Sequence, residues 1–201
     1  MSTKTRTDHK ICRRVGEPVC ESPSCPARDR SYPPGEQGRN RRRQSEYRKQ
    51  LLEKQKLKRK YGLRDGVLRR YFERGFQANE NTGHLLIELL ERRLDNMLFR
   101  MGFARSRAQA RQFVVHGHIE VNGKKMDSPS YEVDAGDVIA PGENSRGMDR
   151  FEEVREAGQA QPLDYIDVVF ETLAGTVIEL PRRSDIPVEL DESLVVEFYS
   201  R

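Results

Sequence analysis

The sequence has few apolar residues and no long apolar run. Of its 201 residues, 35% are hydrophobic and 34% are charged, which predicts a thin core and a large surface that faces solvent or a partner. No stretch of about 18 consecutive apolar residues occurs, so a membrane-spanning helix is excluded. The first residues, MSTKTRTDHK, also lack the apolar segment of a secretory signal. We therefore expect a cytoplasmic protein with no membrane partner.

Cysteine is also scarce. The chain contains three: Cys12, Cys20 and Cys25. An odd number in a cytoplasmic chain argues against disulfides. All three lie in residues 1–44, together with the rigid loop YPPGEQG (32–38) and the basic run RNRRR (39–43). This segment has too little apolar material for its own core, so a metal, RNA or nothing at all holds it. We predict an extended basic arm, poor in regular structure.

Charge is distributed unevenly along the chain. Residues 1–125 carry 30 lysines and arginines against 14 aspartates and glutamates, a surplus of 16 positive charges. Residues 126–201 carry 6 against 18, a surplus of 12 negative charges. This asymmetry indicates a surface that binds a polyanion, backed by an acidic portion that faces solvent or protein. Nucleic acid is therefore favoured over two solvated surfaces that merely differ in charge.

Helical periodicity dominates the centre of the chain. Ser45 is a good N-cap for a helix that ends at Gly62. A second helix is expected after Asp65, and a leucine-rich third helix from about 85 to 101. A fourth, over 107–116, would begin after a serine cap and end at a glycine.

The remainder alternates between short strands and turns. HIEVNGKKM (118–126) predicts a β-hairpin around an Asn-Gly turn. Further strands are expected at SYEV (130–133), DVIA (137–140), DYIDVVFE (164–171), TVIELP (176–181) and LVVEFYS (194–200), with one short helix at 148–157.

These elements predict an α+β protein. It has a mostly helical N-terminal domain with a basic arm, a small helix–helix–hairpin module and C-terminal strands. The expected divisions are the arm at 1–44, a helical domain at 45–91 that is completed by 186–201, the module at 92–155 and the C-terminal strands at 156–201.

The stretch RSRAQARQFVVHGHIEVNG (105–123) combines three arginines and two histidines with one carboxylate, Glu120. It holds no nucleophile with a base and an orienting carboxylate, and two histidines without a third ligand form no metal site. Arg107 and Arg111 share one helix face, and Arg105 lies at the helix N-terminus, which favours phosphate. The stretch predicts an anion-binding surface, in which Arg107 and Arg111 contribute to RNA affinity and not to folding.

Longer stretches resemble a known family. ERRLDNMLFRMGFARSRAQARQFVVHGHIEVNGKKMDSPSYEV (91–133) closely resembles the RNA-binding module named after protein four of the small ribosomal subunit. RSYPPGEQGR (30–39), SEYRKQLLEKQKLKRKYGL (45–63) and ESLVVEFYSR (192–201) resemble the bacterial ribosomal protein family itself, in the same order. The resemblance covers nearly the whole chain and is weakest over 141–185.

This resemblance implies a structural constituent of the 30S subunit with no enzymatic activity and no small-molecule substrate. Members of the family are primary binders of 16S rRNA that nucleate assembly of the 30S body at a five-way helical junction. They influence decoding accuracy together with ribosomal proteins five and twelve of that subunit, and some repress their own mRNA. The residues expected to contact rRNA are Arg39, Arg41, Arg42, Arg43, Arg48, Lys49, Lys54, Lys56, Lys58, Arg59, Lys60, Arg105, Arg107, Arg111, His116, His118 and Lys124.

The resemblance also bears on the arm. Metal-binding members carry C-x2-C followed by C-x4-C there, and this chain has His9-x2-Cys12 followed by Cys20-x4-Cys25. Histidine is itself a good zinc ligand, so the four residues form a Cys3His set that fits one structural zinc. The alternative is a site that has lost its metal, as in many members of the family.

Two other classes of protein share parts of this pattern. An RNA-modifying enzyme would use the module for targeting, but it needs a catalytic domain, and the 61 residues after 140 are too few. A zinc-dependent DNA-binding regulator would need the finger spacing C-x2–4-C-x12-H-x3–5-H, which the chain lacks. The structural, rRNA-binding interpretation is therefore preferred.

Overall fold

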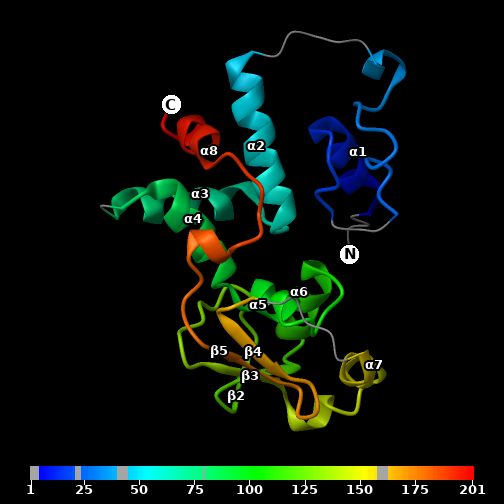
Figure 1. Ribbon diagram of the computed structural model, residues 1–201, viewed down its shortest axis with the longest axis vertical. Coiled ribbons are helices and arrows are strands. Elements are labelled where there is room, and N and C mark those ends of the chain that lie inside the picture. Colours follow the sequence, from blue (N-terminus) through cyan, green and yellow to red (C-terminus); the bar gives the residue numbers. More distant parts are fainter. Residues whose placement is uncertain (1–4, 21–23, 40–44, 79, 158–162) are drawn as a thin grey trace. The chain divides into compact units, whose positions relative to one another are not determined.

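In the computed structural model, the chain forms two compact units (Figure 1). Unit 1 comprises Met1–Gly83 and Val188–Arg201, and unit 2 comprises His84–Pro187. The structure describes residues 5–20, 24–39, 45–78, 80–157 and 163–201. Within these ranges, no helix has both the length and the apolar character needed to cross a membrane.

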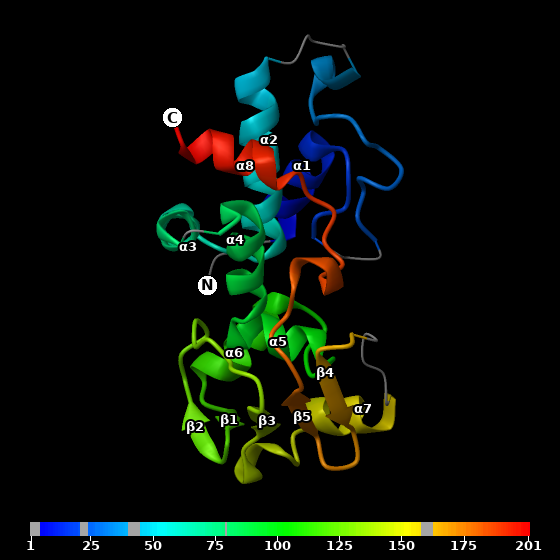
Figure 2. The same cartoon turned by 60° about the vertical axis from the view of Figure 1, so that its left-hand side comes forward.

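Unit 1 is built from helices. They are α1 (Thr5–Val15), a 3-10 turn (Glu36–Arg39), α2 (Glu46–Lys60), α3 (Asp65–Gln77) and α8 (Glu192–Tyr199). As expected, Ser45 caps α2: its hydroxyl accepts a hydrogen bond from the Arg48 N–H at 3.3 Å. The C-terminal α8 lies against α2 and α3 (Figures 1 and 2), where the rings of Phe72 and Tyr199 stack with centroids 5.0 Å apart.

Two expectations for unit 1 are wrong. LVVEFYS (194–200) forms most of helix α8 and not a strand, because the Asp191 carboxylate caps it by accepting from the Leu194 N–H at 3.3 Å. Contacts with α2 then override the strand propensity of its valines. The arm at 1–44, expected to be poor in regular structure, contains the 11-residue helix α1.

Unit 2 combines helices with a small antiparallel sheet. Its helices are α4 (Thr82–Glu91, whose first two residues belong to unit 1), α5 (Leu94–Arg100), α6 (Arg107–Val115) and α7 (Asp149–Ala157), with 3-10 turns at Glu143–Ser145 and Arg183–Asp185. Its strands are β1 (Ile119–Val121), β2 (Lys124–Met126), β3 (Val138–Pro141), β4 (Ile166–Val169) and β5 (Ala174–Val177). Their order in the sheet is β2-β1-β3-β5-β4 (Figure 2).

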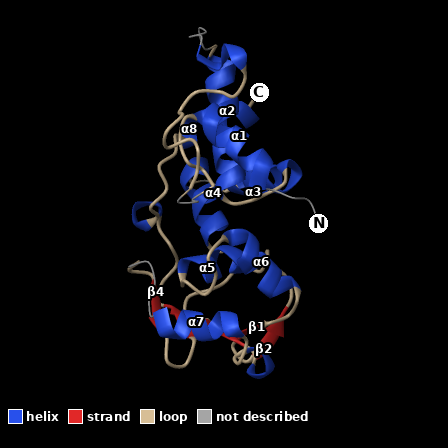
Figure 3. Ribbon diagram, turned by 90° about the vertical axis from the view of Figure 1, so that its right-hand side faces the viewer, coloured by secondary structure: helices blue, strands red, loops and turns tan. Residues whose placement is uncertain are grey.

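One core holds unit 2 together. Helices α5, α6 and α7 lie against the sheet (Figure 3). Met97, Phe113 and Phe151 of these helices belong to the same buried cluster as Ile139 of β3. The rings of Phe113 and Phe151 lie 5.0 Å apart and join α6 to α7. The α+β class is thus confirmed, with the strands of the described residues all in unit 2.

The expected hairpin is present. Asn122 and Gly123 have φ angles of 52° and 73°, which is the left-handed conformation that a two-residue hairpin turn requires. The Asn122 side chain donates to the Asp137 carboxylate at 2.8 Å and accepts from the Val138 N–H at 2.9 Å. This residue therefore ties the turn to the start of β3.

Two expectations for unit 2 are wrong. The single helix expected from 85 to 101 is two helices, because Arg93 adopts an extended conformation between α4 and α5. Around this break the backbone pairs with residues 131–133: the Leu94 N–H donates to the Tyr131 carbonyl, and the Val133 N–H to the Arg92 carbonyl, both at 2.9 Å. SYEV (130–133) consequently forms an isolated bridge to this linker and not a strand of the sheet.

Candidate nucleic-acid interface and metal centre

The arm brings four metal-ligand side chains together. Helix α1 presents His9 and Cys12 one turn apart, and the loop that follows supplies Cys20 and Cys25. One potential ligand atom from each residue lies within 4.8 Å of the other three. Cys12 and Cys25 are almost completely buried, and among the described residues Val19, Ala27 and partly buried neighbours form an apolar cluster around them. The spacing in the sequence thus corresponds to a real cluster in space.

This cluster fits the coordination chemistry of zinc. A tetrahedral zinc ion with Zn–S bonds of about 2.3 Å separates its ligand atoms by about 3.8 Å, and Cys20 Sγ lies 3.7 Å from His9 Nδ1. Three soft sulfur donors and one imidazole form a common structural zinc set. Burial raises the pKa of the Cys12 thiol to about 12, and a bound cation would displace that proton.

The lysines of α2 have unequal surroundings. Lys54 is buried, forms an ion pair with Asp65, and lies 5.0 Å from the centre of the Phe198 ring. Hydrogen bonding from Lys54, with a contribution from Lys58, lowers the pKa of the Asp65 carboxyl. Lys56 pairs with Glu17 of the arm at 2.6 Å. These lysines connect elements of unit 1, so their charges are largely neutralised by carboxylates of the protein itself.

Other expected rRNA contacts are more open. Arg48, Lys49, Arg105, His116 and Lys124 are exposed, whereas Arg59, Lys60 and His118 are half-buried. Two of the exposed side chains have carboxylate partners: Lys49 pairs with Glu46 at 2.8 Å and Arg105 with Glu153 at 2.9 Å. Arg41, Arg42 and Arg43 lie outside the described residues.

The histidines of the 105–123 stretch do not form a catalytic pair. His118 Nδ1 lies 3.0 Å from the Ser145 hydroxyl, and its ring meets the Phe113 ring edge-on. The His116 ring lies 6.0 Å from that of His118, centroid to centroid. His118 therefore has a structural contact with the 3-10 turn at Glu143–Ser145. His116 is an exposed polar group at the end of α6.

A buried polar network lies beneath α5 and α6. The Glu91 carboxylate, fully buried, accepts two hydrogen bonds from Arg100 at 2.7 and 3.0 Å and one from Asn96 at 2.5 Å. The Tyr165 hydroxyl donates to it at 3.5 Å, and burial together with the Glu91 charge raises the pKa of that phenol. Glu91 and Arg100 thus neutralise each other inside the fold and are not part of a charged surface.

A second buried carboxylate extends the network. Asp95 receives hydrogen bonds from Arg93 at 2.8 and 3.0 Å and from Arg111 at 2.6 and 2.9 Å. Arg107 donates to the Asn96 side-chain oxygen at 2.6 Å, and its guanidinium lies 4.4 Å from the centre of the Phe99 ring. Hydrogen bonds to α5 therefore fix the side chains of Arg107 and Arg111 on α6.

The expectation that Arg107 and Arg111 do not contribute to folding disagrees with their surroundings, whereas their contact with rRNA stays a prediction. Arg107 is only 7% exposed, and both arginines bond to polar groups that α5 provides. Those partners are 11 and 16 residues away in sequence, so the positions one helical turn away on α6 do not reveal them. The motif RLDN (93–96), just before α5 and in its first turn, was the signal available in the sequence.

We predict that the two α6 arginines differ in their effect on stability. Arg107→Met should lower the free energy of unfolding by about 1–3 kcal/mol, because the buried Asn96 oxygen loses its donor. Arg111→Met should cost less than about 1 kcal/mol, because its side chain is 28% exposed and Asp95 keeps Arg93. Urea unfolding followed by circular dichroism measures both. Equal losses would contradict this assignment of roles.

Two family models match successive parts of the chain. Residues 3–91 match the ribosomal protein S4/S9 N-terminal domain, and residues 92–139 match the S4 domain. The chain is 46% identical over 199 residues to small ribosomal subunit protein uS4 of Halothermothrix orenii, with 96% of each chain covered. It is 44% identical over 207 residues to small ribosomal subunit protein uS4A of Alkaliphilus oremlandii, with both chains covered completely.

A third relative, small ribosomal subunit protein uS4A of Symbiobacterium thermophilum, is 46% identical over 198 residues, again with 96% of each chain covered. The family is structural, which confirms that the chain is not an enzyme. Since these similarities extend over nearly the whole length of the sequence, the chain belongs to the bacterial ribosomal protein S4 family.

Proposed function

We propose that this chain is a structural constituent of the small ribosomal subunit that binds 16S rRNA directly. The observation that carries the proposal is an S4 domain at 92–139 within a chain whose first 125 residues have a surplus of 16 positive charges. Exposed basic side chains of the arm, α2 and the hairpin supply phosphate contacts. In this role the protein acts in the cytoplasm, as part of the ribosome.

The finer role follows the family resemblance. The chain acts as a primary binder that nucleates assembly of the 30S body at a five-way rRNA junction, and contributes to decoding accuracy with ribosomal proteins five and twelve. Its own mRNA is a further candidate ligand. These roles need basic side chains in fixed positions, and the hydrogen bonds that Arg107 and Arg111 donate to α5 support that requirement.

The proposal includes one structural zinc ion in the arm, held by His9, Cys12, Cys20 and Cys25. The support is the short separation of the four donors and the small apolar cluster around them. Zinc would supply the cross-link that a larger apolar core provides elsewhere. A fixed arm can then present its arginines in one arrangement.

The expected result for rRNA binding is a steep dependence on salt. Each neutralised phosphate releases counterions, so four contacts lower the affinity about 100-fold between 50 and 200 mM salt. Filter binding of the purified protein to 16S rRNA, without other ribosomal proteins, measures this slope. Poly(A) at equal nucleotide concentration serves as the non-specific control. A flat response, or equal affinity for both RNAs, would count against the proposal.

A further inference from the structure

Tyr32 lies between two arginines on the arm. The guanidinium carbon of Arg13, from α1, lies 5.0 Å from the centre of the Tyr32 ring, and that of Arg39, from the 3-10 turn, lies 5.3 Å from it. Arg13 Nε also donates to the Tyr32 carbonyl at 3.2 Å, and Arg39 Nη2 to the Tyr32 hydroxyl at 3.5 Å. Cation–π contact and hydrogen bonding thus hold two cations at a single ring.

The loop YPPGEQG is shaped to bring these groups together. The prolines at 33 and 34 restrict the backbone after Tyr32, and the chain turns back so that Gly38 approaches Pro33 closely. A Cβ at position 38 would lie 1.9 Å from the Pro33 carbonyl oxygen, so only glycine permits this turn. The close approach returns Arg39 to the ring seven residues earlier in the chain.

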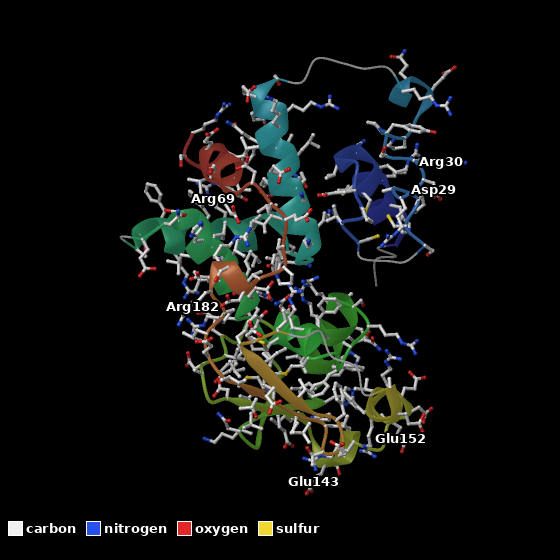
Figure 4. The ribbon with its side chains drawn as sticks, in the orientation of Figure 1. Asp29, Arg30, Arg69, Glu143, Glu152 and Arg182 are labelled. Carbon is white, nitrogen blue, oxygen red and sulfur yellow. The ribbon has the colours of Figure 1, made fainter. Side chains whose placement is uncertain are left out.

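The positive charge at this ring has no counterpart within the described part of the protein. No described carboxylate forms an ion pair with Arg13, Arg30 or Arg39, although Asp29 precedes Arg30 on the arm (Figure 4). This differs from α2, where Lys49, Lys54, Lys56 and Lys58 each have a carboxylate partner.

The phenol itself reports the uncompensated charge. The hydrogen bond from Arg39, followed by the charges of Arg39, Arg30 and Arg13, lowers the pKa of Tyr32 below its ordinary value. Two guanidinium groups held at one ring repel each other, and apart from their attraction to the ring no described carboxylate offsets that repulsion. An anion placed between them would do so.

We propose that Arg13, Tyr32, Arg39 and the neighbouring Arg30 form a phosphate-binding cluster for the RNA backbone. This rests on the proposed rRNA-binding function and specifies one of its contacts. Guanidinium groups bind phosphate oxygens in a bidentate manner, and fixing them on an aromatic ring reduces the entropy lost on binding. Tyr32 is the positioning residue, and the two stacked arginines are the groups that touch the phosphate.

The chain offers a matched control in Arg14. It follows Arg13 in α1, is exposed, and makes no contact with Tyr32 in the described structure. Arg14→Gln therefore removes the same charge from nearly the same place without disturbing the cluster. Full-length, zinc-loaded protein is used throughout, with 16S rRNA as the probe over a salt series.

Arg13→Gln and Arg39→Gln should each weaken binding about tenfold and lower the salt slope by about one phosphate contact. Arg14→Gln should weaken it by no more than about twofold, as expected for a charge that only adds to the general field. Tyr32→Leu retains every charge and should still lose about threefold in affinity, since the guanidinium groups are no longer held in place. The zinc content and melting temperature of each variant identify any variant that is misfolded. If Arg13→Gln is misfolded, Arg13→Lys, which retains the charge, takes its place.

The outcomes distinguish a failure of the proposed rRNA binding from a failure of the proposed phosphate-binding cluster. If the wild-type protein shows no salt-dependent binding to 16S rRNA, the proposed function itself fails. If it binds but Arg13→Gln, Arg39→Gln and Arg14→Gln behave alike, the arm contributes only diffuse charge and the cluster is overturned. If the cluster variants bind rRNA normally but are released from 30S particles in sucrose gradients, the anion is a protein carboxylate, which also overturns the proposal.

Discussion

Replacing Arg100 by methionine is expected to lower the free energy of unfolding of unit 2 by about 3–5 kcal/mol. Arg100 is 3% exposed and forms two hydrogen bonds to the Glu91 carboxylate, which has no exposure to solvent. Methionine fills a similar space but leaves that charge buried without its two-fold cationic partner, although the Asn96 amide and the Tyr165 hydroxyl still bond to it. Removing one partner of a buried ion pair costs more than the intact pair contributes, because the remaining charge has lost its counterion while it stays in the core.

Two further variants test that explanation. Adding Glu91→Gln to Arg100→Met removes the stranded charge, so the double variant should recover more than half of the loss despite carrying one more substitution. Arg69→Met breaks an exposed ion pair with Glu73 on α3 and should change stability by less than about 1 kcal/mol. Urea unfolding at pH 7, followed by circular dichroism, compares all four proteins. A double variant less stable than Arg100→Met would show that the volume of the arginine matters more than the stranded charge.

The elements that sequence reasoning predicts correctly are those with local causes. The Ser45 cap and the Asn122-Gly123 turn depend on neighbouring residues alone, and both occur where expected. The acidic surplus of residues 126–201 predicts a portion that faces solvent or protein. Part of it meets basic groups, since Glu153 of α7 pairs with Arg105.

The errors have non-local causes. LVVEFYS has the composition of a strand. Apart from the local Asp191 cap, its helical conformation follows from contacts with α2, more than 130 residues earlier in the chain. Arg107 has no acidic residue one turn away on α6, so the sequence predicts a surface cation, whereas in the structure its guanidinium donates to Asn96 of α5. In both cases the partner comes from another element, and periodicity within one segment carries no information about it.

The cluster of His9, Cys12, Cys20 and Cys25 shows the value of spacing combined with a family pattern. Three cysteines and one histidine are separated by loops of unequal length, and periodicity alone gives no reason for them to meet. The resemblance supplied the grouping, and the structure brings the four donors within 4.8 Å. The contacts of Tyr32 with Arg13 and Arg39 could not be predicted in this way. They depend on the close backbone approach at Gly38, which no pattern in the sequence indicates.

Protein purified without chelator is expected to contain about one zinc ion per chain, bound by His9, Cys12, Cys20 and Cys25. The apolar cluster of the arm is small: Cys12, Val19, Cys25 and Ala27 are its buried members. Such a cluster is far too small to hold 30 or more residues without a cross-link. Apparent zinc-binding free energies of about 10–16 kcal/mol in zinc-finger peptides are folding free energies, and removing the metal here should unfold the arm in the same way.

Elemental analysis by mass spectrometry, together with the reaction of thiols with a chromogenic disulfide, gives the test. Cys12→Ser should lose the metal, whereas His9→Cys should retain it by forming a four-cysteine set. His116→Asn, which changes an exposed histidine of unit 2, is the matched control and should retain one zinc. On chelation all three thiols should become reactive, the helical signal of α1 should decrease, and unit 2 should keep its unfolding midpoint, because its core contains no residue of the arm. Metal-free protein whose thiols react freely while α1 remains folded would show that the arm is stable without zinc, and that the four donors are the remnant of a lost site.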